Sequence, residues 1–221
     1  AAEWDVVGLY RADHAAAASL REAWGGAPGL RLHACDLTSP EQVEALLEAL
    51  GPDFCPDALV HLASPPLQLA PLHRTGWEEF ERQLDGVLKA AVLLTQPLLR
   101  RMLRRGHGRV IAALSSAAIG RPPRGFGSYA TAKYALAGYM RSLAAEYAGR
   151  GISANTVSAG PMDTAMLREL PAPLREELRA SIPGGEWIAP RAVAGAIWWL
   201  AADAGAELTG CNLPLSAGAA F

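Results

Sequence analysis

The chain has 221 residues, a formal net charge of −2 and a hydrophobic fraction of 51%. This length suits one domain with a substantial core, and the near-neutral balance gives no sign of nucleic acid as a bulk partner. Three widely spaced cysteines and five histidines without metal-ligand spacing indicate reduced thiols in a cytoplasmic protein and no metal site. No apolar stretch reaches 18 residues and no charged-then-apolar leader opens the chain, so we expect neither a membrane span nor a signal peptide.

Short apolar runs alternate with amphipathic stretches along the chain. The runs predict strands at 6–10, 30–34, 58–62, 110–114, 152–157 and 212–215. The stretches predict helices at 13–24, 40–50, 75–105, 128–149 and 190–202, and a mobile helical excursion at 161–187. Strand and helix in succession predict parallel strands joined by right-handed crossovers, with helices on both faces. We therefore expect one doubly wound α/β domain over residues 1–221.

Three of these elements carry more detailed expectations. The first strand, 6–10, is apolar enough to be buried. The helix at 40–50 has Ser39 as its N-cap, Pro40 at its first position and Gln42 three residues after the cap. The long helix at 75–105 contains Pro97, which predicts a bend.

The helix at 128–149 carries a pair of chemistry-bearing residues. Tyr129 and Lys133 are four residues apart and therefore share one helix face, so both can point at one ligand. Lys133 is one of only two lysines among 20 basic residues, the other being Lys89. Ser116 lies thirteen residues before Tyr129.

Several further motifs accompany this pair in a fixed order. They are Cys35–Thr38, Asp57–Ser64, Gly108–Ile111, Ser115–Ser116, Tyr129–Lys133, Asn155–Thr164, Pro190–Ala194 and Leu208–Gly210. In this order and at these separations they resemble the short-chain dehydrogenase/reductase family over nearly the whole chain. The chain is most similar to the 3-oxoacyl-carrier-protein reductase type. The resemblance implies a Rossmann-like fold and NADPH-dependent reduction of a carbonyl substrate, such as a 3-oxoacyl thioester.

The resemblance also assigns three catalytic roles. Tyr129 would donate a proton to the carbonyl oxygen as hydride arrives from the nicotinamide, which is general acid catalysis. Lys133 would hydrogen-bond the nicotinamide ribose, and its charge would lower the pKa of Tyr129 from the free value of about 10. Ser116 would orient the carbonyl, and is preferred to Ser115 because thirteen residues is the family spacing.

NADP(H) is the cofactor that the resemblance implies. Arg11, just past the first strand, would meet the 2′-phosphate, where an acidic residue would suit NAD. The other implied positions are a pair that flanks adenine, a tight turn after the strand at 58–62, and a loop that closes over the nicotinamide carboxamide. These positions are Asp36 and Leu37, then Ala63, then Gly160, Met162 and Thr164.

Plainer structural roles compete with some of these. Arg11 equally suits a solvated charge beside a helix, and Asp36 suits an Asx-type turn. His61 is expected as a buried strand residue with a hydrogen-bonded ring. The arginines at 100–109 suit a solvated helix end or, alternatively, a docking patch for an acidic acyl carrier protein, with Arg150 nearby.

The N-terminal region of the chain departs from the family pattern. It opens with residues that resemble those just before the family's second strand, so the first strand, the first helix and the turn of the type Thr-Gly-x-x-x-Gly-x-Gly are absent from it. Three explanations are open: other residues supply the strand, the strand at 6–10 pairs directly with the strand at 58–62, or another chain donates a strand. We favour the first.

Two substitutions depart from the family pattern as well. Val87 stands where the family has an Asn that holds a helix distortion and a water bridging to the lysine, and valine can do neither by hydrogen bonding. The family's Asn-Asn-Ala-Gly turn is His61-Leu62-Ala63-Ser64, followed by two prolines. Serine in place of glycine is expected to crowd the backbone's approach to the cofactor.

These departures keep other functions open. One alternative is a non-reducing pseudoenzyme or partner subunit of the same fold, and another is half of a hetero-oligomer whose partner carries the cofactor. The helices at 75–105 and 128–149 are those through which the family usually self-associates. We therefore expect a homodimer or homotetramer, acting on a small-molecule or acyl-carrier-bound carbonyl substrate.

Overall fold

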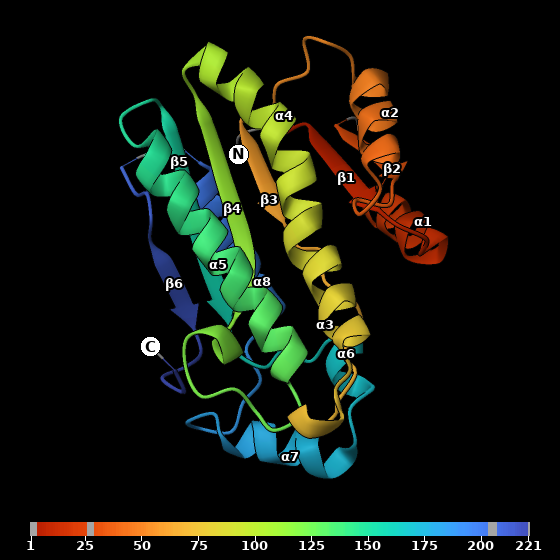
Figure 1. The fold of residues 1–221 in the computed structure, drawn as a ribbon, viewed down its shortest axis with the longest axis vertical. Coiled ribbons are helices and arrows are strands. Elements are labelled where there is room, and N and C mark those ends of the chain that lie inside the picture. The colour runs from red at the N-terminus through yellow and green to blue at the C-terminus, as the bar shows by residue number, and fades with distance from the viewer. Residues whose placement is uncertain (1–3, 26–28, 203–206, 221) are drawn as a thin grey trace. The chain divides into compact units, whose positions relative to one another are not determined.

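The computed structural model describes residues 4–25, 29–202 and 207–220. Its chain forms two compact units, Ala1–Phe54 and Cys55–Phe221. Strand pairing among the described residues is parallel throughout, and helices follow the strands as predicted (Figure 1). The predicted α/β class with a parallel sheet is therefore confirmed, while the extent of a single domain over 1–221 stays a prediction.

The first unit is built from two strands and two helices. These are β1 (Val6–Tyr10), α1 (His14–Ala23), β2 (Leu30–Ala34) and α2 (Pro40–Leu50). β1 pairs only with β2 in a two-stranded sheet, which leaves Val6 36% exposed and the rest of β1 half-buried. The expectation of a buried first strand is thus wrong, because one pairing neighbour covers only one edge of it.

The start of α2 follows its sequence signals. Ser39 is the N-cap and its Oγ accepts a hydrogen bond from the Gln42 backbone N–H at 3.2 Å, with a proline at the helix start. The Gln42 side chain accepts from the Asp36 N–H at 2.8 Å instead of closing back on the cap. Asp36 in turn accepts from the N–H and hydroxyl of Thr38, so it forms the Asx-type turn that its residue type favours.

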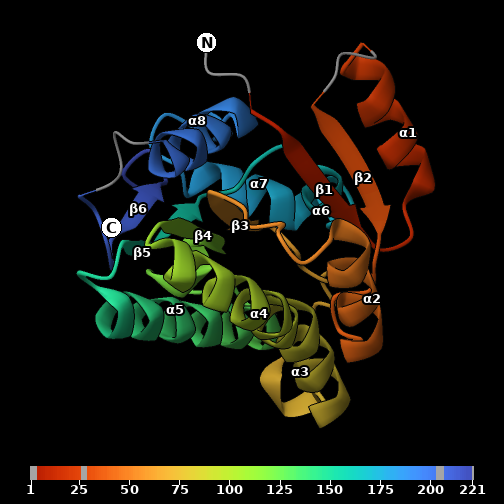
Figure 2. The same cartoon turned by 90° about the horizontal axis from the view of Figure 1, so that it is seen from above.

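The second unit contains a four-stranded parallel sheet in the order β3-β4-β5-β6. Its strands are β3 (Ala58–His61), β4 (Gly108–Ser115), β5 (Ile152–Ala159) and β6 (Asn212–Leu215). Figure 2 shows α4 (Ala90–Arg105) and α5 (Gly127–Tyr147) on one face of this sheet and α8 (Pro190–Ala201) on the other. Every residue of β5 is buried, as a central strand covered on both faces requires.

The connections of this unit hold shorter elements. They are η1 (Leu72–Arg74), α3 (Trp77–Leu84), η2 (Asp85–Lys89), η3 (Ser116–Ala118), α6 (Ala165–Arg168) and α7 (Ala172–Ala180). Within this unit β3 forms one edge of the sheet. Within the described ranges, no helix combines the length and apolarity needed to cross a membrane.

The predicted helix at 75–105 is interrupted, but away from Pro97, which lies inside α4. The interruption is η2, a π-helical turn that includes Val87, only 2% exposed. Pro65 packs on Gly86 in this turn so closely that a Cβ there would overlap its ring. The helix distortion thus forms without the family's Asn, with a buried valine and a glycine that admits Pro65.

The arginines at the end of α4 do not form one solvated group. Arg105 donates to the carbonyls of Cys55 and Pro56 at 2.9 and 2.8 Å and pairs with Asp57 at 3.0 Å. Arg109 is buried at 7% exposure and donates to backbone carbonyls. The expectation of a solvated charge is therefore wrong for Arg109, which is buried at the start of β4, whereas Arg105 is exposed and also anchors the residues that lead into β3.

His61 ends β3 and has the buried role expected of it. Its ring is 7% exposed, and its Nε2 forms a 2.8 Å hydrogen bond with Thr95 Oγ1 on α4. Burial lowers the pKa of His61 to about 4. The ring is therefore neutral in the folded protein at neutral pH.

The pKa of His61 makes stability depend on pH. Because its folded pKa is lowered from 6.5, the unfolded chain takes up the proton first and stability falls as the pH drops from 6.5 towards 4. We expect this residue to contribute a loss of about 2 kcal/mol between pH 7.5 and pH 5. Urea unfolding of the native chain and of His61→Gln at both pH values measures it. An equal loss in the two proteins contradicts the prediction.

Candidate functional site

A cavity of about 730 Å³ opens in the second unit where β4 and β5 end. Ser115 is the last residue of β4, and Ala159 is the last of β5; the two are register partners, and both line the cavity. Tyr129 reaches the cavity from the first turn of α5, which begins at Gly127. The carboxyl ends of parallel strands and a helix start thus converge on one hollow, the usual position of a ligand in this architecture.

Tyr129 is held by neighbours on both sides. Its ring lies edge-on to the ring of Phe126, with centroids 6.1 Å apart. Burial raises the pKa of Tyr129, and a side-chain hydrogen bond with Ser115 lowers it only in part. The expected lowering by Lys133 does not appear, because burial outweighs the other influences. The phenol is thus held in its protonated form.

Lys133 lies one turn further along α5 and is 4% exposed. Its Nζ donates to the Ala113 carbonyl at 2.9 Å and lies 5.7 Å from the centroid of the Tyr129 ring. Ala113 follows the last β3–β4 register pair, His61 with Ala112, so no β3 residue is paired with it. Burial lowers the pKa of Lys133 to about 8.

The two serines at the end of β4 and the start of η3 have different surroundings. Ser115 Oγ accepts a hydrogen bond from the Ala117 N–H at 3.2 Å as the N-cap of η3, and its side chain is the one bonded to Tyr129. Ser116 starts η3 and also lines the cavity. Both serines therefore lie at the cavity with Tyr129, and the family spacing that favours Ser116 stays a prediction.

The segment after β5 closes another side of the cavity. Gly160, Met162 and Thr164 all line it, as an implied cofactor loop requires. A Cβ on Gly160 would lie 3.1 Å from Ile188 Cγ1 and 3.2 Å from Ser216 Cα, so only glycine fits without displacing its neighbours. The Thr164 N–H donates to the Met162 carbonyl at 2.8 Å and sets the bend of this loop.

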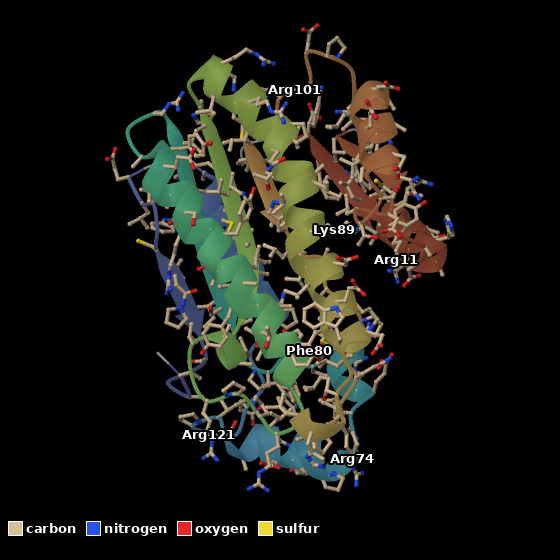
Figure 3. The ribbon with its side chains drawn as sticks, viewed as in Figure 1. Arg11, Arg74, Phe80, Lys89, Arg101 and Arg121 are labelled. Carbon is tan, nitrogen blue, oxygen red and sulfur yellow. The ribbon has the colours of Figure 1, made fainter. Side chains whose placement is uncertain are left out.

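The remaining predicted cofactor residues are not among the described residues that line this cavity. Arg11, Asp36 and Leu37 belong to the first unit, where Arg11 is exposed just after β1 (Figure 3). Ala63 is exposed in the loop after β3. In the part of the chain that the structure describes, Ala63 and Lys133 are not among the residues lining the cavity.

A partly buried polar cluster, which the sequence did not reveal, includes Ser128, the residue before Tyr129. Glu79 on α3 accepts hydrogen bonds from Arg82, Gln83 and Ser128, the last at 3.2 Å. Burial acts to raise the pKa of Glu79, but these hydrogen bonds outweigh it, so the pKa is lowered. Arg82 and Gln83 also donate to the Pro66 carbonyl. The cluster ties the loop after β3 to the residue preceding the tyrosine.

No cluster of three or more His, Cys, Asp or Glu side chains suited to a metal ion occurs among the described residues. The side chains that line the cavity include the hydroxyls of Ser115, Ser116 and Tyr129, and the buried amine of Lys133 lies one helical turn from Tyr129. A phenol bonded to a serine, near a buried lysine, can donate a proton to a ligand oxygen.

Comparison with known proteins identifies the class. Residues 1–220 match the family profile described as enoyl-(acyl carrier protein) reductase. The chain is 31% identical over 214 residues to the 3-oxoacyl-[acyl-carrier-protein] reductase FabG of Escherichia coli (strain K12), covering 96% of this chain and 86% of that protein. It is also 31% identical over 209 residues to the D-threitol dehydrogenase of Mycolicibacterium smegmatis, covering 91% and 78%.

A solved structure gives the same result. The Pseudomonas aeruginosa RhlG/NADP active-site complex is 28% identical and superposes with a TM-score of 0.86, covering 97% of this chain and 86% of that one. The chain belongs to the short-chain dehydrogenase/reductase family, and it is an oxidoreductase of that class.

The two lysines of the chain allow a direct test of the Lys133 environment. In a sample with isotope-labelled lysine, we expect the Lys133 side-chain resonance to titrate near pH 8, below the ordinary 10.5, because burial disfavours the charged amine. Lys133→Met assigns the signal, and the exposed Lys89 supplies the reference. A midpoint above 10 for Lys133 contradicts the prediction.

Proposed function

We propose that this chain reduces the carbonyl group of a 3-oxoacyl thioester or a similar substrate, with NADPH as hydride source and Tyr129 as proton donor. The observation that carries the proposal is the Ser115–Tyr129 pair at the cavity, with buried Lys133 one helical turn away. The substrate class is supported by the FabG relatives, which are named 3-oxoacyl-[acyl-carrier-protein] reductases. The cofactor is supported by the similar RhlG structure, which is a complex with NADP.

The residues of the second unit fit the nicotinamide end of the cofactor. Lys133 can donate three hydrogen bonds, and among the described residues only the Ala113 carbonyl accepts one. The remaining donors of a buried amine suit ribose hydroxyls, and the close backbone packing at Gly160 suits a flat ring beside it. When bound, the reduced nicotinamide supplies hydride to the carbonyl carbon.

The side chains then complete the reduction. The Ser115 hydroxyl orients the substrate oxygen, and the neutral Tyr129 gives its proton to that oxygen as the carbon–oxygen double bond becomes a single bond. The phenolate left behind is stabilised by the Ser115 hydroxyl and by the charge of Lys133. A pKa of about 8 leaves most Lys133 side chains charged at neutral pH.

The Ser115 assignment differs from the one that spacing alone favours, and paired variants distinguish them. We expect Tyr129→Phe to lower kcat at least 100-fold with cofactor binding retained, because the phenyl ring has no proton to give. Ser115→Ala should lower kcat/KM at least 10-fold, since the bond to the phenol is lost.

The matched control is Ser116→Ala, for which we expect less than a threefold change. Steady-state reduction of a 3-oxoacyl thioester, followed through NADPH absorbance, measures all three variants. If Tyr129→Phe retains turnover, Tyr129 is not the proton donor. If Ser116→Ala lowers kcat/KM more than Ser115→Ala does, Ser116 is the catalytic serine, as the family spacing implies.

NADPH preference rests on Arg11. Its guanidinium is exposed after β1 and has no hydrogen-bond or ion-pair partner in the described ranges, so it is available for a 2′-phosphate. We expect NADPH to bind at least tenfold tighter than NADH, and Arg11→Ala to remove that difference. Fluorescence titration of both nucleotides, with Arg21→Ala as a surface control, measures it.

Equal affinities in the native chain contradict the NADPH assignment. Binding of neither nucleotide contradicts the reductase proposal and favours the alternative, a non-reducing partner subunit of the same fold. The observation behind that alternative is Val87, which is buried and cannot hydrogen-bond a water beside Lys133.

We also propose self-association as a homodimer or homotetramer through the helical face of the second unit. The exposed aromatic side chains Tyr134 on α5 and Trp77 on α3 support it, at 48% and 66% exposure. An acyl carrier protein is a further proposed partner, supported by the name of the FabG relatives and by the exposed arginines Arg100, Arg104 and Arg105 on α4, whereas Arg109 is buried.

A further inference from the structure

Two arginines line the cavity that holds the Ser115–Tyr129 pair, and the proposed reaction uses neither. Arg121 and Arg124 come from the loop between η3 and α5, and both are exposed. In the described part of the chain, neither makes a hydrogen bond or an ion pair. Figure 3 shows Arg121 at the end of the unit where α7 lies. These two guanidiniums are charges that a ligand can reach.

The loop that carries the arginines is fixed by backbone bonds at several points. The Gly120 N–H donates to the Ser116 carbonyl at 2.9 Å, and the Phe126 N–H donates to the Pro123 carbonyl at 3.3 Å. Gly125 adopts a φ of 82° and accepts from the Ala70 N–H at 3.3 Å. The loop thus starts after Ser115 and Ser116, ends three residues before Tyr129, and places both arginines in the lining of the same cavity.

The rest of the lining is mainly apolar. Phe126, Leu167, Leu170 and Leu178 form one buried cluster on this wall, each at most 9% exposed. The only acidic side chain among the described lining residues is Glu177 on α7, which is exposed. Two cations therefore outnumber one anion around a hollow that is otherwise suited to hydrocarbon.

This combination defines a substrate with three parts. The hydroxyls can bind a carbonyl oxygen, and the apolar wall can pack against a carbon chain. The two guanidinium groups suit the oxygens of a carboxylate or a phosphate. We infer that the substrate carries an anionic group and that Arg121 and Arg124 bind it while its carbonyl lies at Ser115 and Tyr129. The inference rests on the proposed function and adds the charge of the substrate to it.

Pairs of substrates that differ in a single anionic group test the inference. The first pair is 3-oxohexanoyl phosphopantetheine and 3-oxohexanoyl pantetheine, which differ by one phosphate. The second is a long-chain keto carboxylic acid and its methyl ester, so the two pairs separate phosphate from carboxylate. We expect kcat/KM to favour the anionic member of at least one pair by tenfold or more at low salt, and the advantage to shrink as salt screens the charges.

Charge variants then assign the preference to residues. Arg121→Ala/Arg124→Ala should bring the ratio of kcat/KM for the anionic and neutral members close to one, and Glu177→Gln should increase it. Arg104→Ala, an exposed arginine near the C-terminal end of α4, is the matched control and should leave the ratio unchanged. A ratio near one in the native chain for both pairs, or an equal loss on both members in the double variant, overturns the inference.

A binding measurement separates this inference from the proposed function. Calorimetric titration of the corresponding 3-hydroxyacyl phosphopantetheine and pantetheine, and of the hydroxy acid and its ester, needs no hydride transfer. Tighter binding of an anionic member, lost in the double variant, supports the inference even if no substrate is reduced, in which case the reductase proposal fails alone. Equal binding within both pairs overturns the inference while leaving the reductase proposal intact.

Discussion

The hydrogen bond from the Lys133 ammonium to the Ala113 carbonyl is the constraint on which the site depends. A buried amine is costly without partners, and this carbonyl lies just past the last β3–β4 register pair. Where β3 stops therefore decides where the lysine is anchored. Because Lys133 and Tyr129 share a helix face, anchoring the lysine also fixes the helix that brings the phenol to the end of β4.

A second set of contacts fixes the start of that helix. The N-cap residue of α5, Phe126, makes no side-chain cap hydrogen bond, and Ser128 in the first turn of the helix donates to Glu79 on α3. The same carboxylate binds Arg82 and Gln83, which also hold the Pro66 carbonyl. The tyrosine is thus fixed from one side by Lys133 and from the other by a charged, hydrogen-bonded cluster, which is the kind of support that a proton donor needs.

The π-helical turn at Asp85–Lys89 shows how one local feature can be built from different residues. The family pattern places a hydrogen-bonding Asn there, and this chain has a buried valine instead. The distortion persists because Gly86 allows Pro65 to pack directly against the helix backbone. Packing thus maintains the π-helical turn at this position, whereas Val87 cannot make the hydrogen bonds of the family's Asn.

The sequence by itself determined the order of strands and helices, the Ser39 cap, the Asx turn at Asp36, the buried state of His61, and the family. These features depend on neighbours in the sequence or on hydrophobic periodicity, which a single sequence contains. Only the tertiary structure shows that Ser115, Ser116 and Tyr129 line one cavity, that burial raises the pKa of the phenol, and that Arg109 is buried. It also decided that Arg121 and Arg124 line the same cavity as the tyrosine. Each of these depends on where strands end and on which side chains lose water, and those are properties of the packed chain.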